Sequence, residues 1–173
     1  MKPIIPPIDK AILKQELSSD KFLRPTNKAH NEIYVITAHN APNVMLEIGR
    51  LRELSFRSGG GGTGEEIDTD EYDYMEKPYF QLVVWDPVAL EIIGGYRYLP
   101  GHDVDFDEAG QPKFVMSHLF IFTEKFIKEY HFIPHWPDDR KEDDEYRENI
   151  WEFDVCLLFK NNRIVNLLKM FIT

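Results

Sequence analysis

The stretch "YFQLVVWDPVALEIIGGYRYLPG", from Tyr79 to Gly101, decides the fold of this chain. Its two runs, "YFQLVVWD" (Tyr79 to Asp86) and "EIIGGYRYLPG" (Glu91 to Gly101), are rich in β-branched and aromatic residues, which favour strands. Only "PVAL" separates the runs, so the pattern predicts a hairpin of two antiparallel strands. We expect this hairpin to form the centre of a sheet.

Strand and helix patterns continue on both sides of the hairpin. "EIYVITA" (Glu32 to Ala38) predicts a further strand. The following run, "HNAPNVMLEIGRLRELSFRS", offers Asn40 as a candidate cap and Pro42 in the first turn, with apolar residues at helical spacing. It predicts a helix over 42–57. "SHLFIFTEKFIKEY" predicts a second long helix over 117–130.

The order strand, helix, hairpin, helix predicts an α/β (α+β) fold with a mixed, mainly antiparallel sheet flanked by helices. The strands at 32–38, 79–86 and 91–99 are expected to be adjacent, with the two helices on the faces of the sheet. We divide the chain into an N-terminal helical extension (1–30), a core (31–130) and a C-terminal segment (131–173).

The two ends of the chain differ from this core. "DKAILKQEL" (9–17) predicts a short amphipathic helix, which packs on its own domain or lies on a partner or a membrane surface. From residue 131 the composition changes. Two prolines and seven carboxylates lie between residues 131 and 148, and they predict a charged loop or helix. The apolar tail that follows predicts a last strand and helix.

Composition restricts the function classes. A chain of 173 residues with 43% hydrophobic residues is long enough for one core. A net charge of −10 argues against nucleic acid as a partner, since phosphate binding needs clustered Lys and Arg. Cys156 is the single cysteine, which fits a reducing compartment. The N-terminus lacks the apolar run of a signal peptide, so we expect a cytoplasmic protein without a membrane span, while peripheral contact with the inner face of a membrane stays open.

The most unusual run is "SGGGGTGEEIDTDEYD" (58–73), four glycines followed by carboxylates. A dinucleotide-binding loop needs a strand before it and a helix after it, and here the order is reversed. A P-loop needs Lys where Glu65 stands. A calcium loop needs Gly where Asp73 stands, so we predict no metal site. Two interpretations remain: a mobile loop that delivers carboxylates to an active site, or a solvated surface loop.

Two arginines favour the first interpretation. Arg52 lies on the same helix face as the apolar residues, near the start of the glycine loop, and a cation beside a core usually has a carboxylate partner. Asp70 and Asp73 are close in the sequence and could supply this partner. Arg97 stands inside a strand that should be largely buried. Alternatively, either arginine extends its charged end to solvent.

These residues together carry a resemblance to a known family. R-x-x-x-F (Arg52 and Phe56), D-x-x-D (Asp70 and Asp73) and "GGYRYLP" with Arg97 resemble the acyl-homoserine-lactone synthase and ornithine-lipid N-acyltransferase branch of the GNAT superfamily. The bacterial GNAT proteins labelled haemolysin-like are the nearer match. The resemblance covers about residues 9 to 130.

The resemblance implies a GNAT-like core and an enzyme that moves a fatty (3-hydroxy)acyl group to the amine of an amino acid or lyso-lipid. The donor would be acyl carrier protein or acyl-CoA, with no tightly bound cofactor. It implies Asp70, Asp73 and Arg97 as catalytic residues. Arg52, Phe56 and Glu66 are the residues expected to bind substrate.

One part of the family pattern is missing after Tyr130. The family continues with a strand bearing E-L-G-R and a segment that cradles the donor, and neither is found in this sequence. We therefore expect 131–173 to be divergent, truncated or read in a shifted frame, so that the C-terminal half of the fold is incomplete. The rival interpretations are a non-catalytic binding or regulatory module, an inactive truncated homologue, or a structural acidic domain.

Overall fold

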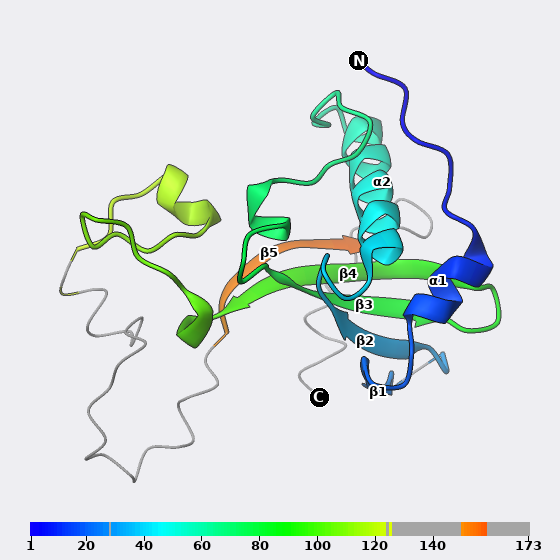
Figure 1. Cartoon of the computed structure of the whole chain (residues 1–173). Helices are drawn as coiled ribbons and strands as arrows, with labels where there is room; N and C mark the ends of the chain where they lie inside the picture. The colour runs from blue at the N-terminus through cyan, green and yellow to red at the C-terminus, as the bar shows by residue number, and fades with distance from the viewer. Residues whose placement is uncertain (28, 124, 126–149, 159–173) are drawn as a thin grey trace, which may run out of the picture.

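The computed structural model describes residues 1–27, 29–123, 125 and 150–158 (Figure 1). Its helices are α1 (Lys10–Glu16) and α2 (Pro42–Ser58), and short 3₁₀ turns lie at Glu71–Asp73, Gly101–Asp103 and Val115–His118. Its strands are β1 (Phe22–Pro25), β2 (Glu32–Ile36), β3 (Phe80–Asp86), β4 (Glu91–Pro100) and β5 (Ile150–Leu158).

Within the described residues the strands form one sheet in the order β1-β2-β3-β4-β5, and every neighbouring pair is antiparallel. The predicted hairpin is confirmed as β3 and β4, with Gln81 opposite Arg97 and Val83 opposite Gly95. The predicted adjacency of β2, β3 and β4 and the α+β class are also confirmed. Strand β1 was not predicted from the sequence. Its four residues, "FLRP", are all exposed, so they do not show the alternation of apolar and polar residues that marks a half-buried strand.

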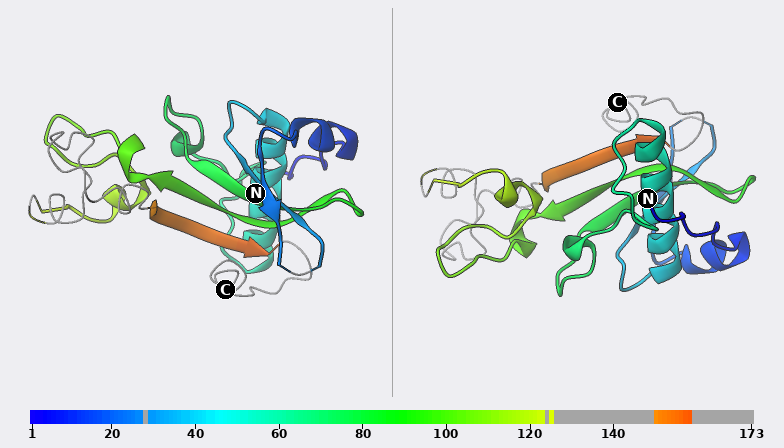
Figure 2. Two further views of the ribbon diagram at one scale, coloured as in Figure 1. Left: turned by 90° about the horizontal axis from the view of Figure 1, so that it is seen from below. Right: turned by 90° about the horizontal axis from the view of Figure 1, so that it is seen from above.

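Both helices pack on the same face of the sheet, as Figures 1 and 2 show. A buried apolar cluster joins them to side chains of β2, β3 and β4 on that face: Leu13, Leu17, Tyr34, Ile36, Ala38, Ala41, Val44, Met45, Ile48, Val83, Trp85 and Ile92. Leu13 of α1 is buried in this cluster, so the amphipathic helix packs on its own domain. Burial of these side chains is the main favourable term that holds α2 on the sheet.

The N-terminus of α2 is capped from a distant part of the chain. The Glu16 carboxylate, at the end of α1, accepts hydrogen bonds of 2.9 Å from the backbone N–H groups of Asn43 and Val44. The expected cap, Asn40, instead accepts a hydrogen bond from the backbone N–H of Thr37, so that prediction is wrong. A carboxylate suits this place because it satisfies free N–H groups and faces the positive end of the helix dipole.

The helix predicted over 117–130 is wrong for residues 119–123, which have no regular secondary structure; 124 and 126–130 lie outside the described residues. The physical reason is a side-chain clamp on the backbone. The Gln111 amide donates to the Phe122 carbonyl and accepts from the Phe122 N–H, at 3.1 and 2.8 Å. The Phe122 ring meanwhile packs on Phe114, with centroids 5.1 Å apart. These contacts take the peptide groups that a helix would use.

The glycine run turns back against the C-terminal end of α2. Gly60 and Gly64 have φ near +83° and +82°, which side chains disfavour. A Cβ atom on Gly62 would lie 2.5 Å from Arg57 Cγ and 2.9 Å from Glu53 Oε1. The glycines therefore let the chain turn closely against the end of α2.

Glu53 holds the far side of this turn. Its fully buried carboxylate accepts hydrogen bonds from the Thr63 N–H and hydroxyl, the Gly64 N–H and Arg57 Nε, at 2.6 to 2.9 Å. Burial alone would raise the pKa of Glu53, but these donors outweigh it and lower the pKa to about 2. The same turn also binds the N-terminus, since Lys2 N–H donates to the Gly64 carbonyl at 2.7 Å.

We predict that Gly62→Ala destabilises the protein by about 1–3 kcal/mol, because the added methyl must displace packed atoms of α2. Gly61→Ala is the matched control, since a Cβ there meets nothing within 4 Å and φ is not in the left-handed region. We expect that control to stay within about 0.5 kcal/mol of the wild type. Chemical denaturation of the two variants is the measurement, and equal stabilities would contradict the packing argument.

A second prediction concerns pH. The pKa of Glu53 falls from an ordinary 4.5 to about 2 on folding, so its contribution to stability is present above pH 4.5 and is lost as pH falls toward 2. Glu53→Gln should lower the free energy of unfolding at neutral pH, and its deficit relative to the wild type should shrink over that window. Urea denaturation at a series of pH values measures the deficit, and a deficit that does not change with pH would refute the role of the charge.

Candidate active site

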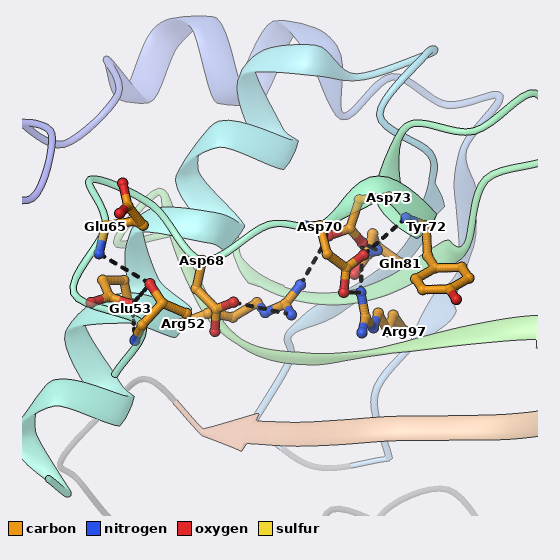
Figure 3. Close-up of polar contacts among 10 residues, drawn as sticks. Arg52, Glu53, Glu65, Asp68, Asp70, Tyr72, Asp73, Gln81 and Arg97 are labelled. Atoms are coloured by element: carbon orange, nitrogen blue, oxygen red, sulfur yellow. Dashed lines mark hydrogen bonds and ion pairs between the residues drawn. The ribbon is translucent and has the colours of Figure 1, made fainter. Parts of the chain in front are cut away.

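A buried network of charges lies between α2, the sheet and the segment that follows the glycine loop, and Figure 3 shows its members. At its centre is Asp73, whose side chain is completely buried. Arg52 comes from α2 and Arg97 from β4, and both are more than nine-tenths buried. A charge in such surroundings is stable only when it is paired and hydrogen-bonded.

The Asp73 carboxylate uses both of its oxygens fully. Oδ1 accepts from Gln81 Nε2 at 2.9 Å and from Arg97 Nη1 at 3.3 Å. Oδ2 accepts from Arg52 Nη1 at 3.3 Å and from the Asp70 N–H at 3.1 Å. With four donors arranged around it, Asp73 has no lone pair left for a substrate proton. Its geometry suits a residue that positions others.

Asp70 is the partly exposed member of the network. Its Oδ2 lies 2.8 Å from Arg97 Nη1, and its Oδ1 accepts from the Tyr72 N–H at 3.0 Å. Asp70 and Asp73 form a capping box around the 3₁₀ turn Glu71–Asp73, each side chain accepting a hydrogen bond from backbone near the other. The Asp70 side chain is 38% exposed, so solvent reaches this carboxylate.

Arg97 is held on the inner face of the sheet by more than its ion pairs. Its register places it opposite Gln81 of β3, so both polar side chains point toward Asp73. The guanidinium carbon also lies 5.1 Å from the centre of the Tyr79 ring, a cation–π contact. These contacts fix the plane of the guanidinium group.

Asp68 joins the network from the other side of Arg52. Asp68 Oδ1 lies 3.6 Å from Arg52 Nη2, and the Asp68 N–H donates to the Gly49 carbonyl of α2 at 2.9 Å. The segment can approach the helix because position 49 has no side chain: a Cβ there would lie 2.7 Å from Thr69 Cγ2. Burial raises the pKa of Asp68, and the nearby Arg52 charge opposes the rise.

The structure confirms the predicted contacts of Arg52 and Arg97 with the two aspartates. Phe56 lies half-buried one turn beyond Arg52 on α2. Glu66 is exposed and lies beside the N-terminal segment, where its carbonyl accepts from the Ile5 N–H, so it is not brought to the network. The roles of all these residues in binding or catalysis remain predictions.

Sequence reasoning missed Gln81 and passed over Asp68. A signal existed for Gln81, because it is a polar residue at an inward position of a strand whose alternate residues Val83 and Trp85 are buried. Asp68 gave no such signal, since it is one of several carboxylates in an acidic run and only the fold separates them.

Two kinds of site are not found in the part of the chain that the structure describes. There, no three His, Cys, Asp or Glu side chains gather as a metal ion would require. Among the same residues, none of the helices has the length and apolar character needed to cross a membrane.

The fold and the network thus define an α+β domain with a buried arginine–aspartate cluster. Comparison with known proteins finds two relatives that are similar in sequence. The glycine N(alpha)-acyltransferase of Phocaeicola vulgatus is 65% identical over 130 residues, and that of Bacteroides thetaiotaomicron is 62% identical over 130 residues. Each match covers 75% of this chain but only 40% and 39% of the relatives, so the chain spans about two fifths of their length.

No family model matches the chain, and no solved structure matches it either. The names of the relatives agree with the expected similarity to N-acyltransferases. They do not distinguish the haemolysin-like or ornithine-lipid branch, which stays a prediction.

We predict that Asp73→Asn destabilises the protein by about 3–5 kcal/mol, because it leaves two buried guanidinium groups without their shared counter-charge. Asp70→Asn should cost less, since that side chain is partly in water. Urea denaturation compares the two variants. Equal losses would show that Asp73 is not the centre of the network.

Proposed function

We propose that this protein takes part in N-acyl transfer, moving a fatty (3-hydroxy)acyl group from acyl carrier protein or acyl-CoA to the amine of glycine. The observation that carries the proposal is the identity of 65% and 62% to two proteins named glycine N(alpha)-acyltransferase. The GNAT-like character expected from the sequence belongs to the same proposal. Its acceptor is narrower than the amino acid or lyso-lipid that the sequence alone implied.

The charge network suits the acceptor side of this reaction. An amine attacks a thioester only when it is neutral, so a carboxylate close to it must take up a proton. Arg97 and Asp73 fix the segment that carries Asp68 and Asp70, the two carboxylates of the network with exposed surface. A site held in this way loses little entropy when it orients a small acceptor. We therefore expect activity to depend on Asp70, Asp73 and Arg97.

The donor side rests on the family resemblance. A thioester oxygen gains charge as the tetrahedral intermediate forms, and hydrogen-bond donors must stabilise it. In the family that this chain resembles, those donors belong to the part that would follow Tyr130, and no E-L-G-R run is found there in this sequence. A non-catalytic binding or regulatory module that keeps the acceptor half is the second candidate, because no E-L-G-R run is found among residues 131–173.

The test is formation of N-acylglycine, followed by mass spectrometry, from glycine and a long-chain 3-hydroxyacyl thioester of either donor. We expect the 173-residue chain to be slower by at least about 10²–10³-fold than a chimera whose residues 131–173 are replaced by the corresponding part of the Bacteroides relative. Asp73→Asn in the chimera, refolded and checked by circular dichroism, should abolish the gain.

Each other outcome has a clear meaning. Fast turnover by the 173-residue chain would show that residues 131–173 supply a donor site. A folded chimera that forms no N-acylglycine with either donor would contradict the proposed function and favour the non-catalytic module. An active chimera indifferent to Asp70, Asp73 and Arg97 would show that other residues carry the reaction.

A further inference from the structure

Three aspartates border the two buried arginines, and they differ in how far their oxygens are already used. Asp73 accepts four hydrogen bonds. Asp70 accepts from Arg97 and from the Tyr72 N–H, and its capping box with Asp73 fixes the 3₁₀ turn. Asp68 receives no hydrogen bond from any residue that the structure describes, and its contact with Arg52 Nη2 is 3.6 Å long. Asp68 is therefore the carboxylate with free capacity.

Asp68 is buried enough for that capacity to matter. Its side chain is 15% exposed, so water reaches it but does not surround it. A carboxylate in this position, without donors, is less stable than one with a hydrogen-bonded partner. An ammonium or amine group that entered beside it would supply the missing donors.

A second unsatisfied group lies in the same place. Arg52 Nε is buried and has no hydrogen-bond acceptor among the described residues, although the side chain is more than nine-tenths buried. Nε belongs to the same guanidinium group as Nη2, the Arg52 atom that lies 3.6 Å from Asp68. An α-amino acid carries both missing groups, since its carboxylate accepts from a guanidinium and its amine donates to a carboxylate.

We propose that Asp68 binds the amine of the acceptor and takes up its proton, with Arg52 receiving the carboxylate of the same molecule. This inference rests on the proposed function and names its acceptor subsite. Glycine would bind as a zwitterion. Its ammonium gives one proton to Asp68, which passes it to water; the nitrogen then bonds to the thioester carbon, the C–S bond breaks, and the second proton goes to the thiolate.

The charges that face Asp68 are consistent with this role. Burial raises the pKa of Asp68, and the charges of Glu53 of α2 and Asp73 raise it further. Arg52 of α2 and Arg97 of β4 act in the opposite direction. A bound ammonium would lower the pKa of Asp68 again, because it stabilises the ionised form.

The test uses the full 173-residue chain labelled with ¹³C in its aspartate carboxyl groups, and glycine as the probe. We expect glycine to shift the Asp68 resonance and to lower its titration midpoint, whereas acetate, which has no amine, does not lower that midpoint. Asp68→Asn should weaken glycine binding about tenfold or more, and the remaining binding should no longer be lost as the pH falls. Asp68→Glu should retain binding. Asp105→Asn, in a surface pair with Lys77, is the matched control.

The outcomes separate this inference from the proposed function. A glycine-dependent shift at Asp70 with none at Asp68, or no shift at either, would overturn the assignment of Asp68. A glycine-dependent shift at Asp68, together with weaker glycine binding by Asp68→Asn, would support the inference even where no N-acylglycine forms. In that case the result would contradict the proposed acyl transfer but not the glycine subsite. Where turnover is seen, Asp68→Asn should reduce it about 10²-fold or more, and unchanged turnover would also overturn the inference.

Discussion

The buried carboxylate of Asp73 is the constraint on which the rest of the site depends. It draws together a helix, two strands and a turn, because donors from Arg52, Arg97, Gln81 and the Asp70 backbone all end on its two oxygens. None of these groups would be stable so far from water without the others. The network therefore fixes how the segment after the glycine loop sits on α2 and β4.

The apolar core supports this network because it holds the elements that carry the donors in place. Alternation along β3 sends Gln81 to the same face as Val83 and Trp85, and the helical period of α2 turns Arg52 toward that face with Ile48. Capping by Glu16 then fixes the start of α2 against α1. Because these restraints come from packing, the charged groups lose little additional entropy when they pair.

The sequence predicts the parts of this structure that local periodicity controls. Two runs rich in β-branched and aromatic residues, joined by "PVAL", predicted the β3–β4 hairpin. Apolar spacing predicted α2, and two cations in apolar elements indicated carboxylate partners. Contacts between residues far apart in the sequence could not be predicted from local patterns. Glu16 caps a helix that begins 26 residues later. Gln111 forms two hydrogen bonds with the backbone of Phe122, where a helix was expected. Asp68 could not be told from its acidic neighbours, since only its place against Gly49 and Arg52 distinguishes it.

The segment after the glycine run is fixed at both of its ends. Glu53 holds Thr63 and Gly64 at one end, and Asp73 holds Asp70 at the other, so Asp68 lies on a short segment fixed at both ends. Its own N–H is bound to the Gly49 carbonyl between those points. A carboxylate fixed in this way cannot move to water when its donors are missing, and it keeps its affinity for a donor that arrives from outside. In the acceptor subsite that we propose, the same restraint that costs the free protein stability would hold the carboxylate ready for an amine.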